Sequence, residues 1–464
     1  MKGMVAAGHP LSAEAGARTL RDGGNAVDAA IAAMLTSWVA EPLLTGPGAG
    51  GYMLVAGAGM EPTLLDFFVA APGFGAGDVR GELEAVAVDF GDATQVFNVG
   101  AASVGTYGTP AGIEEAARRW GSVPLGELAA PAAAHARAGV PTNAAQAYIN
   151  AILEGIVHER MLREGEPFAD PELAETIERL GADGAAPFYT GDIAAAVVAE
   201  LEPRGGVLTA EDLARYEPVA RDPARATYRG REILTNPPPN AGGTLLAMAM
   251  ELLERHTGGP PDAVALAAVM EVVQKRRTSE FVSQLGSTTH ISVLDSAGRA
   301  CSVTCTNGEG SGIWIPGTGI HVNNIMGEED LNPLGFHQFP PGRRMPSMMA
   351  PTVVQSEHGV ELVVGSAGSN RIRSAILQTI VGVVDRGLTA REAVEAPRLH
   401  FEDGIVFTEP GIDEQLLRSA GRTVQPFRAI NVFFGGVQAV EHDPRTGNVT
   451  GAGDPRRGGA AVAA

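Results

Sequence analysis

The run from Gly286 to Thr306 constrains the fold most, because it reads as two strands joined by a tight turn. Apolar residues alternate with polar ones at Ile291 and Val293, which is the period of a strand with one buried face. The turn Asp295-Ser296-Ala297-Gly298 follows, and a second strand-like run begins at Ala300. The pattern therefore predicts two consecutive strands in the second half of the chain.

Two threonines, Thr288 and Thr289, stand at the start of the first predicted strand. Thr is a good strand former because its branched side chain packs well on a pleated surface. On the local pattern alone, a structural role is therefore favoured for both residues.

The composition limits the kinds of partner that the chain can bind. The 464 residues carry a net charge of −20, with 34 Lys and Arg against 54 Asp and Glu. Nucleic acids and anionic membranes reward basic patches, so neither is expected as a partner. Hydrophobic residues make up 45% of the chain, which is ample for a large core. The ten histidines show no spacing typical of a metal site, and no metal or cofactor is predicted.

Cysteine usage and the N-terminus bear on the compartment. Cys301 and Cys305 lie on one predicted strand, where four residues span about 13 Å, too far for a disulfide. The first ten residues lack the apolar stretch of a secretory signal peptide. The most apolar later run, Ala29 to Ala40, is too short to cross a bilayer. We therefore expect two buried thiols and a cytoplasmic location.

Periodicity and capping signals predict helices in both halves of the chain. Ser12 is the predicted N-cap of the first helix, and the second helix is apolar nearly all round, which indicates burial. The predicted helices span 12–21, 26–40, 112–120, 125–138, 144–154, 172–180, 244–253, 262–275, 370–384 and 389–396. Strands are predicted over 290–294, 300–306, 321–323, 351–355 and 361–364.

A glycine-rich turn follows the second helix. Gly46, Gly48 and Gly51 match the G-x-G-x-x-G pattern of dinucleotide-binding loops. That role needs a strand before the loop and a helix after it, whereas here the order is reversed. Pro47 also removes one of the N–H groups that would cradle a phosphate. Nucleotide binding is therefore not expected.

Several stretches together resemble the γ-glutamyltranspeptidase family of N-terminal-nucleophile hydrolases, and the resemblance covers nearly the whole chain. They are the Thr pair with its strand, the glycine-rich turn, the Pro-rich segment 236–243 and the tail 451–460. The resemblance implies an α/β fold, a four-layer αββα sandwich, in a single domain over 1–464. The alternation of helical and strand-rich regions fits that architecture.

In that family the chain cuts itself before the first Thr of such a pair. Here the cut would fall between Ser287 and Thr288 and would give a large subunit, 1–287, and a small subunit, 288–464. Thr288 would then be both nucleophile and N-terminus. A Thr hydroxyl needs an adjacent base, and a free α-amine, with a reference pKa of about 7.7–8, is suited to that task. The segment before Thr288 is shorter than is usual in the family.

The resemblance also implies roles for four residues of the small subunit. Thr306 matches the residue whose hydroxyl bonds to the nucleophile and to its amino group. Gly368 and Ser369 match the paired glycines of the loop that supplies the oxyanion hole, where backbone N–H groups must be approachable. Asn307 matches an Asn that contacts the substrate carboxylate, and the shortened loop after it leaves that register open.

The substrate pocket departs from the family pattern. Phe68 stands where the family has a carboxylate-binding Arg, and a phenyl ring cannot replace a guanidinium in that task. The amine-binding acid falls at Glu328, one methylene longer than the usual Asp, and its polar neighbour is replaced by Ile325. The family's Ser pair is Pro346-Ser347 here, which leaves one hydroxyl to bind substrate. Candidate substitutes for the missing cation, each more often a structural or surface Arg, are Arg343, Arg344, Arg371 and Arg373.

We therefore expect a self-processing amide hydrolase or acyltransferase whose partners are a small-molecule amide and the two fragments of one precursor. The substrate would be a γ-glutamyl compound such as glutathione or a related acyl amide, cleaved through an acyl-enzyme on Thr288. The lost Arg supports one alternative, an amidase of cephalosporin-acylase type with a different acyl specificity. The short segment before Thr288 supports another, an unprocessed and non-catalytic scaffold.

Overall fold

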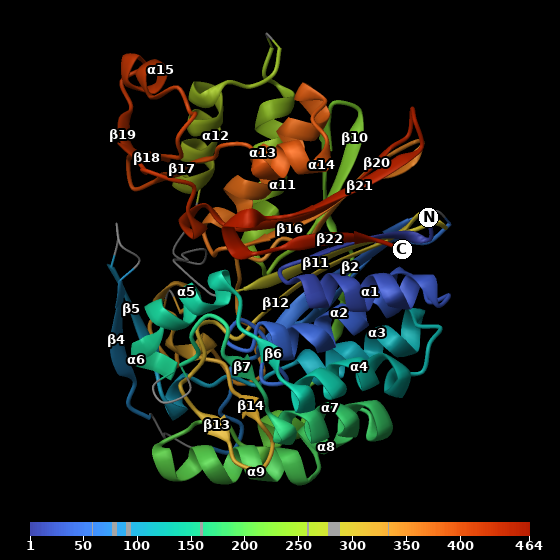
Figure 1. Cartoon of the computed structure of the whole chain (residues 1–464). Helices are drawn as coiled ribbons and strands as arrows, with labels where there is room; N and C mark the ends of the chain where they lie inside the picture. Colours follow the sequence, from blue (N-terminus) through green and yellow to red (C-terminus); the bar gives the residue numbers. More distant parts are fainter. Residues whose placement is uncertain are drawn as a thin grey trace.

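The computed structural model describes residues 1–57, 59–76, 81–89, 94–157, 161–257, 259–276, 288–332 and 334–464 (Figure 1). Ser287, one side of the predicted cleavage site, lies outside the described residues, as does the rest of the segment 277–287. Thr288, on the other side, is described.

The first of two large sheets joins strands from both predicted fragments. Its seven described strands run in the order β22-β1-β11-β12-β2-β3-β8, and every neighbouring pair is antiparallel. The strands are β1 (Gly3–Ala7), β2 (Gly50–Gly57), β3 (Thr63–Phe67), β8 (Val219–Arg221), β11 (Thr289–Asp295), β12 (Arg299–Thr306) and β22 (Ala460–Ala463). Because β1 pairs with both β11 and β22, the two chain ends lie side by side (Figure 1).

The second large sheet is also antiparallel and mixes the two fragments. Its described strands run in the order β21-β20-β16-β15-β10-β9. They are β9 (Ala224–Tyr228), β10 (Arg231–Thr235), β15 (Thr352–Ser356), β16 (Gly359–Ala367), β20 (Gly436–Asp443) and β21 (Asn448–Gly453). The smaller pairs and sheets are β4 (Glu84–Asp89) with β5 (Thr94–Val99), β6 (Val140–Pro141) with β7 (Pro167–Phe168), β13 (Trp314–Ile315) with β14 (Ile320–His321), and β17 (Leu399–Glu402), β18 (Ile405–Thr408) and β19 (Thr423–Pro426).

The two large sheets face each other, and helices cover their outer sides (Figure 1). The side of the first sheet carries α1 (Pro10–Arg21), α2 (Ala26–Ala40), α3 (Thr109–Trp120), α4 (Leu125–Ala138), α5 (Ala144–Ile152), α6 (Glu154–Val157), α7 (Pro171–Asp183), α8 (Ala186–Tyr189), α9 (Asp192–Leu201) and α10 (Ala210–Ala214). The side of the second carries α11 (Ala241–Glu254), α12 (Ala263–Lys275), α13 (Arg371–Arg386), α14 (Ala390–Glu395) and α15 (Glu414–Ser419). The expected α/β class is confirmed.

Alternate side chains along the strands of the first sheet pack into two separate hydrophobic cores. On β2, Tyr52 and Leu54 belong to the core shared with the second sheet, whereas Met53 and Val55 belong to the core under α1, α2, α4 and α7. Successive residues of a strand point to opposite faces, so a strand buried on both sides shows a continuous apolar run. The first sheet is therefore an inner layer, and residues at its strand ends can reach the space between the sheets.

The predicted hairpin forms as expected. β11 pairs with β12 in the register Val293↔Cys301, and the Asp295 carboxylate accepts from the N–H groups of Ala297 and Arg299 at 2.9 and 3.0 Å. These bonds close the turn, as is typical of Asp at its first position. Cys301 and Cys305 are buried free thiols, as predicted. The hairpin thereby holds Thr288 at the entry of β11 beside the end of β12.

The predicted bounds of two helices agree with the structure. Helices α2 and α4 begin and end where predicted. The predicted cap of α1 at Ser12 is wrong, because the helix begins earlier at Pro10 and His9 is its N-cap. The Nδ1 atom of His9 accepts from the Leu11 N–H at 3.2 Å, and proline at the first helical position is pre-organised for a helix start.

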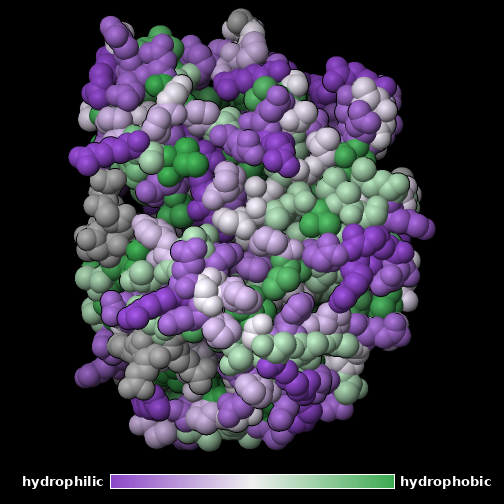
Figure 2. All heavy atoms as spheres, viewed as in Figure 1, coloured by the Kyte–Doolittle hydropathy of each residue, from purple (hydrophilic) through white to green (hydrophobic). Residues whose placement is uncertain are grey.

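The surface fits the composition. Hydrophilic residues are spread over the whole height of the face drawn in Figure 2, and the hydrophobic patches between them are small. Within the described ranges, no helix combines the length and apolarity needed to cross a bilayer.

Candidate active site

A small cavity gathers most of the predicted site residues. Its volume is about 20 Å³, roughly the space of one water molecule. Five of its eleven lining residues are polar: Thr288, Thr306, Glu328, Ser347 and Ser369. Six are apolar: Phe68, Ile325, Leu331, Met348, Met349 and Ile372. The fold thus brings together residues that lie up to about 300 positions apart in the chain.

Thr288 and Thr306 enter the cavity from neighbouring strands. Thr288 directly precedes β11, Thr306 ends β12, and both side chains are largely buried. The Thr306 hydroxyl oxygen accepts from the Gly308 N–H at 2.9 Å. The predicted hydrogen bond from Thr306 toward Thr288 stays a prediction.

The loop between β16 and α13, the predicted oxyanion loop, contains two residues with positive φ. Gly368 has φ +114°, and a Cβ there would lie 2.7 Å from the Gly435 Cα, so only glycine fits. Ser369 also lies in the left-handed region, at φ +51°, which is uncommon for a residue with a side chain. Helix α13 begins at Arg371, so the N–H groups of both residues stand at its positive end.

Two other predicted polar residues reach the cavity from irregular segments. Glu328 follows the 3₁₀ helix η4 (Ile325–Gly327), and its backbone oxygen accepts from the Asn332 side chain at 2.8 Å. The Ser347 hydroxyl oxygen accepts from the Met349 N–H at 3.0 Å, which leaves its proton for another acceptor. Both side chains line the cavity, and their predicted contacts with substrate stay predictions.

Asn307 is not among the residues that line the cavity. Its backbone N–H donates to the Leu44 oxygen at 3.0 Å, and its own backbone oxygen accepts from the Asn324 N–H at 3.1 Å. Its amide nitrogen lies 3.5 Å from the point that a Cβ on Gly46 would occupy. The side chain therefore lies beside the glycine-rich turn, and its predicted contact with a substrate carboxylate stays a prediction.

Phe68 forms one wall of the cavity. Its side chain is fully buried and stacks on Tyr52, with ring centroids 5.4 Å apart. The backbone oxygen of Phe68 accepts from the Tyr216 hydroxyl at 2.7 Å and from an Arg344 nitrogen at 2.9 Å. Arg344 also pairs with the buried Asp66 carboxylate at 3.3 Å. Arg344 therefore fixes the backbone at Phe68 and is not among the residues that line the cavity.

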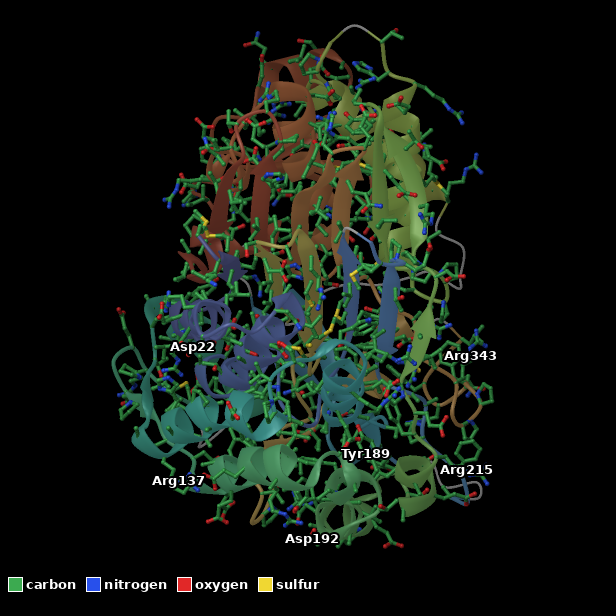
Figure 3. All side chains as sticks on the ribbon, turned by 90° about the vertical axis from the view of Figure 1, so that its right-hand side faces the viewer. Asp22, Arg137, Tyr189, Asp192, Arg215 and Arg343 are labelled. Atoms are coloured by element: carbon green, nitrogen blue, oxygen red, sulfur yellow. The ribbon has the colours of Figure 1, made fainter. Side chains whose placement is uncertain are left out.

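The other candidate cations also lie away from the cavity lining. Arg343 lies at the outer edge of the molecule, against the Phe339 ring at 4.7 Å (Figure 3). Arg371 stacks on Phe433 at 4.2 Å and donates to its backbone oxygen at 3.0 Å. Arg373, two residues further along α13, is buried near the Glu402 carboxylate. None of the four candidate arginines lines the cavity.

One buried acid next to the site was missed from the sequence. Glu41 ends α2, and its carboxylate accepts the Thr289 hydroxyl at 3.0 and 3.1 Å. Burial raises the pKa of Glu41 to about 7, against the opposing effects of this hydrogen bond and of Arg457. In the sequence it reads as the end of a helix before a proline, and its partner lies 248 residues away.

Arg456, near the end of the chain, has structural partners. Arg456 is buried and ion-paired with Glu409 and with Asp454, the latter at 3.2 Å. Asp454 is also paired with Arg398 at 2.7 Å. Removing one member of such a buried network leaves an unpaired charge and typically costs about 3–5 kcal/mol.

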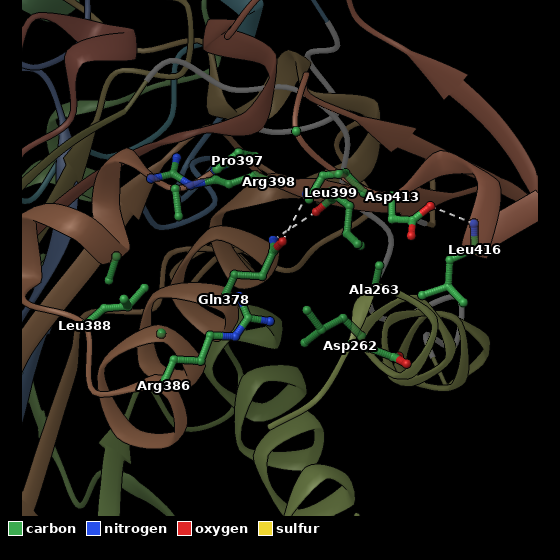
Figure 4. A pocket seen from close by; sticks show the side chains of 16 residues that line it. Asp262, Ala263, Gln378, Arg386, Leu388, Pro397, Arg398, Leu399, Asp413 and Leu416 are labelled. Atoms are coloured by element: carbon green, nitrogen blue, oxygen red, sulfur yellow. Dashed lines mark hydrogen bonds between the residues drawn. The ribbon is translucent and has the colours of Figure 1, made fainter. Parts of the chain in front are cut away.

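A larger cavity lies elsewhere and lacks comparable chemistry. It has a volume of about 240 Å³ and lies between α12, α13 and the strand β17 (Figure 4). There Gln378 bonds to both backbone groups of Leu399, at 3.0 and 2.9 Å. Within the described ranges, no group of three or more His, Cys, Asp or Glu side chains could hold a metal ion. The small cavity at Thr288 is the candidate active site because it gathers five of the predicted site residues.

Comparison with known proteins agrees with this geometry. The sequence model of the Gamma-glutamyltranspeptidase family matches residues 12–274 and 261–464. The chain belongs to the γ-glutamyltranspeptidase family. The predicted resemblance is confirmed. Its relatives are hydrolases and acylases, which indicates that this chain is a hydrolase or transferase.

Relatives of this γ-glutamyltranspeptidase family member include glutathione hydrolases and acylases. The glutathione hydrolase proenzyme of Escherichia coli strain K12 is 30% identical over 98% of this chain and 90% of its own length. The acylase ACY 1 proenzyme of Pseudomonas sp. strain V22 is 30% identical over 100% of this chain and 93% of its own length. The crystal structure of cephalosporin acylase from Bacillus halodurans superposes with a TM-score of 0.84, at 26% identity, over 100% of this chain and 96% of that one.

Proposed function

We propose that this chain is a self-processing N-terminal threonine amidase or acyltransferase with the four-layer αββα architecture of its class. The chain would cut itself between Ser287 and Thr288 into subunits 1–287 and 288–464. One observation carries the proposal: Thr288, Thr306 and Ser369 meet in a single cavity at the end of the β11–β12 hairpin. Two facing sheets between helical layers support the architecture.

The reaction would proceed through two acyl-transfer steps. The Thr288 hydroxyl attacks the amide carbon while the α-amine of the same residue accepts its proton. The developing oxyanion accepts hydrogen bonds from the N–H groups of Gly368 and Ser369, at the N-terminal end of α13. The ammonium then protonates the leaving amine, and water or an acceptor amine releases the acyl group from Thr288.

The cavity lining points to an acyl group other than γ-glutamyl. A γ-glutamyl group presents a carboxylate and an ammonium, and binding the carboxylate without a cation would cost desolvation with nothing in return. No Arg, Lys or His occurs among the described residues that line the cavity, whereas the acid Glu328 is present. We therefore propose an acyl amide whose acyl chain has an amine but no free carboxylate. The acylase-named relatives support this departure from glutathione.

A set of four anilides would test this specificity, because its members differ only in the charged groups on a common chain. They are γ-glutamyl, with both charges, glutaryl, with the carboxylate only, 4-aminobutanoyl, with the amine only, and butanoyl, with neither. The proposal expects the highest kcat/KM for the 4-aminobutanoyl compound and the lowest for the glutaryl compound. Preference for either carboxylate compound would overturn the specificity and leave the acyl-transfer chemistry standing.

A denaturing gel of the purified protein separates the enzyme from the scaffold hypothesis. Processing predicts two unequal fragments that meet near residue 288. A single intact band in protein that hydrolyses none of the four anilides would favour the non-catalytic scaffold instead.

A further inference from the structure

The buried carboxylate of Glu41, at the end of α2, contacts Thr289, the first residue of β11. Glu41 is only 1% exposed, and its backbone N–H donates to the Ser37 oxygen at 2.8 Å, which fixes the residue to the end of α2. The Thr289 hydroxyl donates to its two carboxylate oxygens at 3.0 and 3.1 Å. These contacts tie a charged group to the residue directly after Thr288.

Close packing leaves this carboxylate little freedom to move. A Cβ on Gly8, between β1 and α1, would lie 2.4 Å from the Glu41 Oε1 atom and 2.9 Å from the Thr289 hydroxyl oxygen. Glycine at this position therefore lets the loop close over the pair. The next residue, His9, is kept neutral because burial lowers its pKa to about 4.

One cation faces Glu41 from the tail of the chain. Arg457 lies in the 3₁₀ helix η7 (Pro455–Arg457), and its charge favours the ionised form of Glu41. Asp454 and Glu309 face the same guanidinium. An Arg457 nitrogen also lies 3.7 Å from the point that a Cβ on Gly368 would occupy. The guanidinium therefore interacts with the buried acid and lies close to the predicted oxyanion loop.

The geometry brings Glu41 within electrostatic reach of the Thr288 α-amine. Neighbouring residues of a strand point to opposite faces, so Thr288 faces the cavity while Thr289 points back to α2. The covalent path from the Thr289 hydroxyl oxygen to the Thr288 nitrogen is short, and the hydrogen bond to Glu41 adds 3.0 Å. Together they limit the distance from the Glu41 carboxylate to the Thr288 α-amine to about 10 Å. At that distance and an effective dielectric constant of about 20, one charge shifts the titration of another by about one pH unit.

We propose that Glu41 is a positioning residue for the reaction at Thr288, fixing the start of β11 through the Thr289 hydroxyl and strengthening the α-amine as a base through its negative charge. The inference rests on the proposed function, since the α-amine exists only after cleavage before Thr288. Because burial raises the pKa of Glu41 to about 7, its charge changes over the pH range in which an α-amine titrates.

The pH dependence of kcat/KM in Glu41→Gln tests the electrostatic part. The variant keeps the size of the side chain and removes the negative charge, so the ammonium of Thr288 loses a stabilising partner. The acid limb of the profile is expected to move about 0.5–1 pH unit lower. An acid limb at the wild-type pH would overturn the electrostatic role. Glu309→Gln is the matched control, because Glu309 also faces Arg457. An equal shift in that variant would assign the effect to Arg457 instead.

Thr289→Val tests the positioning part and does not depend on the folding of the Glu41 variant. Valine keeps the shape and removes the hydroxyl donor, so kcat is expected to fall about tenfold with KM changed less than about twofold. Thr289→Ser restores the donor and is expected to restore kcat. A wild-type kcat in Thr289→Val would overturn the positioning role. Wild-type protein without a Thr288 N-terminus would instead contradict the proposed function, so the two failures are distinguishable.

Discussion

The two sides of the cavity differ in what they retain of the family pattern. The reaction edge, formed by Thr288, Thr306 and Ser369 of the lining together with the adjacent Gly368, has the hydroxyl groups and the positive-φ loop that the proposed acyl transfer would use. The acyl wall, formed by Phe68, Ile325 and Leu331 beside Glu328, has apolar side chains where a γ-glutamyl group would need polar and cationic ones.

Under the proposed function, this difference separates the residues of the reaction from the residues that select the acyl group. The reaction edge belongs to a hairpin and to a helix start inside the two-sheet core, so its geometry follows from the fold. The acyl wall comes from the segments after β3 and around η4, where one side chain can change without moving a strand. A family member of this kind can therefore retain the reaction while its acyl group changes.

The largest expected effect comes from removing the proposed nucleophile. Thr288→Ala should abolish both the chain break and the amidase activity, a loss of at least about 10³-fold. Thr379→Ala is a matched control, because Thr379 is buried in α13 and its hydroxyl bonds to the Ala375 oxygen at 2.8 Å. A gel and an anilide assay check both variants. Processing or turnover in Thr288→Ala would remove Thr288 from the reaction edge.

The oxyanion loop should show the next largest effect, and it offers a contrasting pair. Gly368→Ala forces a Cβ into φ +114° and against the Gly435 Cα, so kcat should fall about 10²–10³-fold as the N–H groups move. Ser369→Gly relaxes φ +51° and keeps its N–H group, so kcat should stay within about threefold. Equal losses in the two variants would contradict the backbone role.

Behind the reaction edge, Glu41 should make stability depend on pH. Its pKa is raised from 4.5 to about 7 in the folded chain, so folding favours the protonated form. The stability from this group is complete below pH 4.5 and is lost as pH rises through 7, by at most about 3 kcal/mol. Glu41→Gln should remove that loss. Denaturant unfolding at pH 5 and pH 8, both in a Thr288→Ala background, would show it, and parallel pH dependences would contradict it.

The smallest expected effect comes from a change in the acyl wall. It tests most directly whether the wall, and not the reaction edge, selects the acyl group. Phe68→Arg restores a cation to the cavity, so kcat/KM for the glutaryl anilide should rise about tenfold relative to the butanoyl anilide. Phe68→Leu keeps the wall apolar and should leave that ratio unchanged. The thermal unfolding of both variants is measured to check that they fold, because the arginine replaces a fully buried side chain. An unchanged ratio in a folded Phe68→Arg would show that the wall does not decide the acyl group.

Sequence reasoning was most successful where the determinants are local. The bounds of α2 and α4 and the hairpin of β11 and β12 follow from periodicity and a turn of ordinary type. It was wrong at Ser12, because an Nδ1 atom of histidine can cap a helix as an oxygen does. The predicted break before Thr288 involves residues outside the described ranges and stays a prediction.

The assembly of the site could be predicted only through family resemblance. No local pattern places Phe68, Glu328 and Ser369 at one cavity, since they come from separate layers and loops. Glu41 was missed because its importance depends on burial and on a partner 248 residues away. Whether a carboxylate is solvated at a helix end or buried behind a strand is a property of the packed structure.

The central claim is that a peptide bond is given up so that a threonine can act as its own proton acceptor. N-terminal sequencing of catalytically active protein tests it most directly. The account predicts a fragment that begins Thr288-Thr289-His290-Ile291. Active protein in which no chain begins at Thr288 would contradict it.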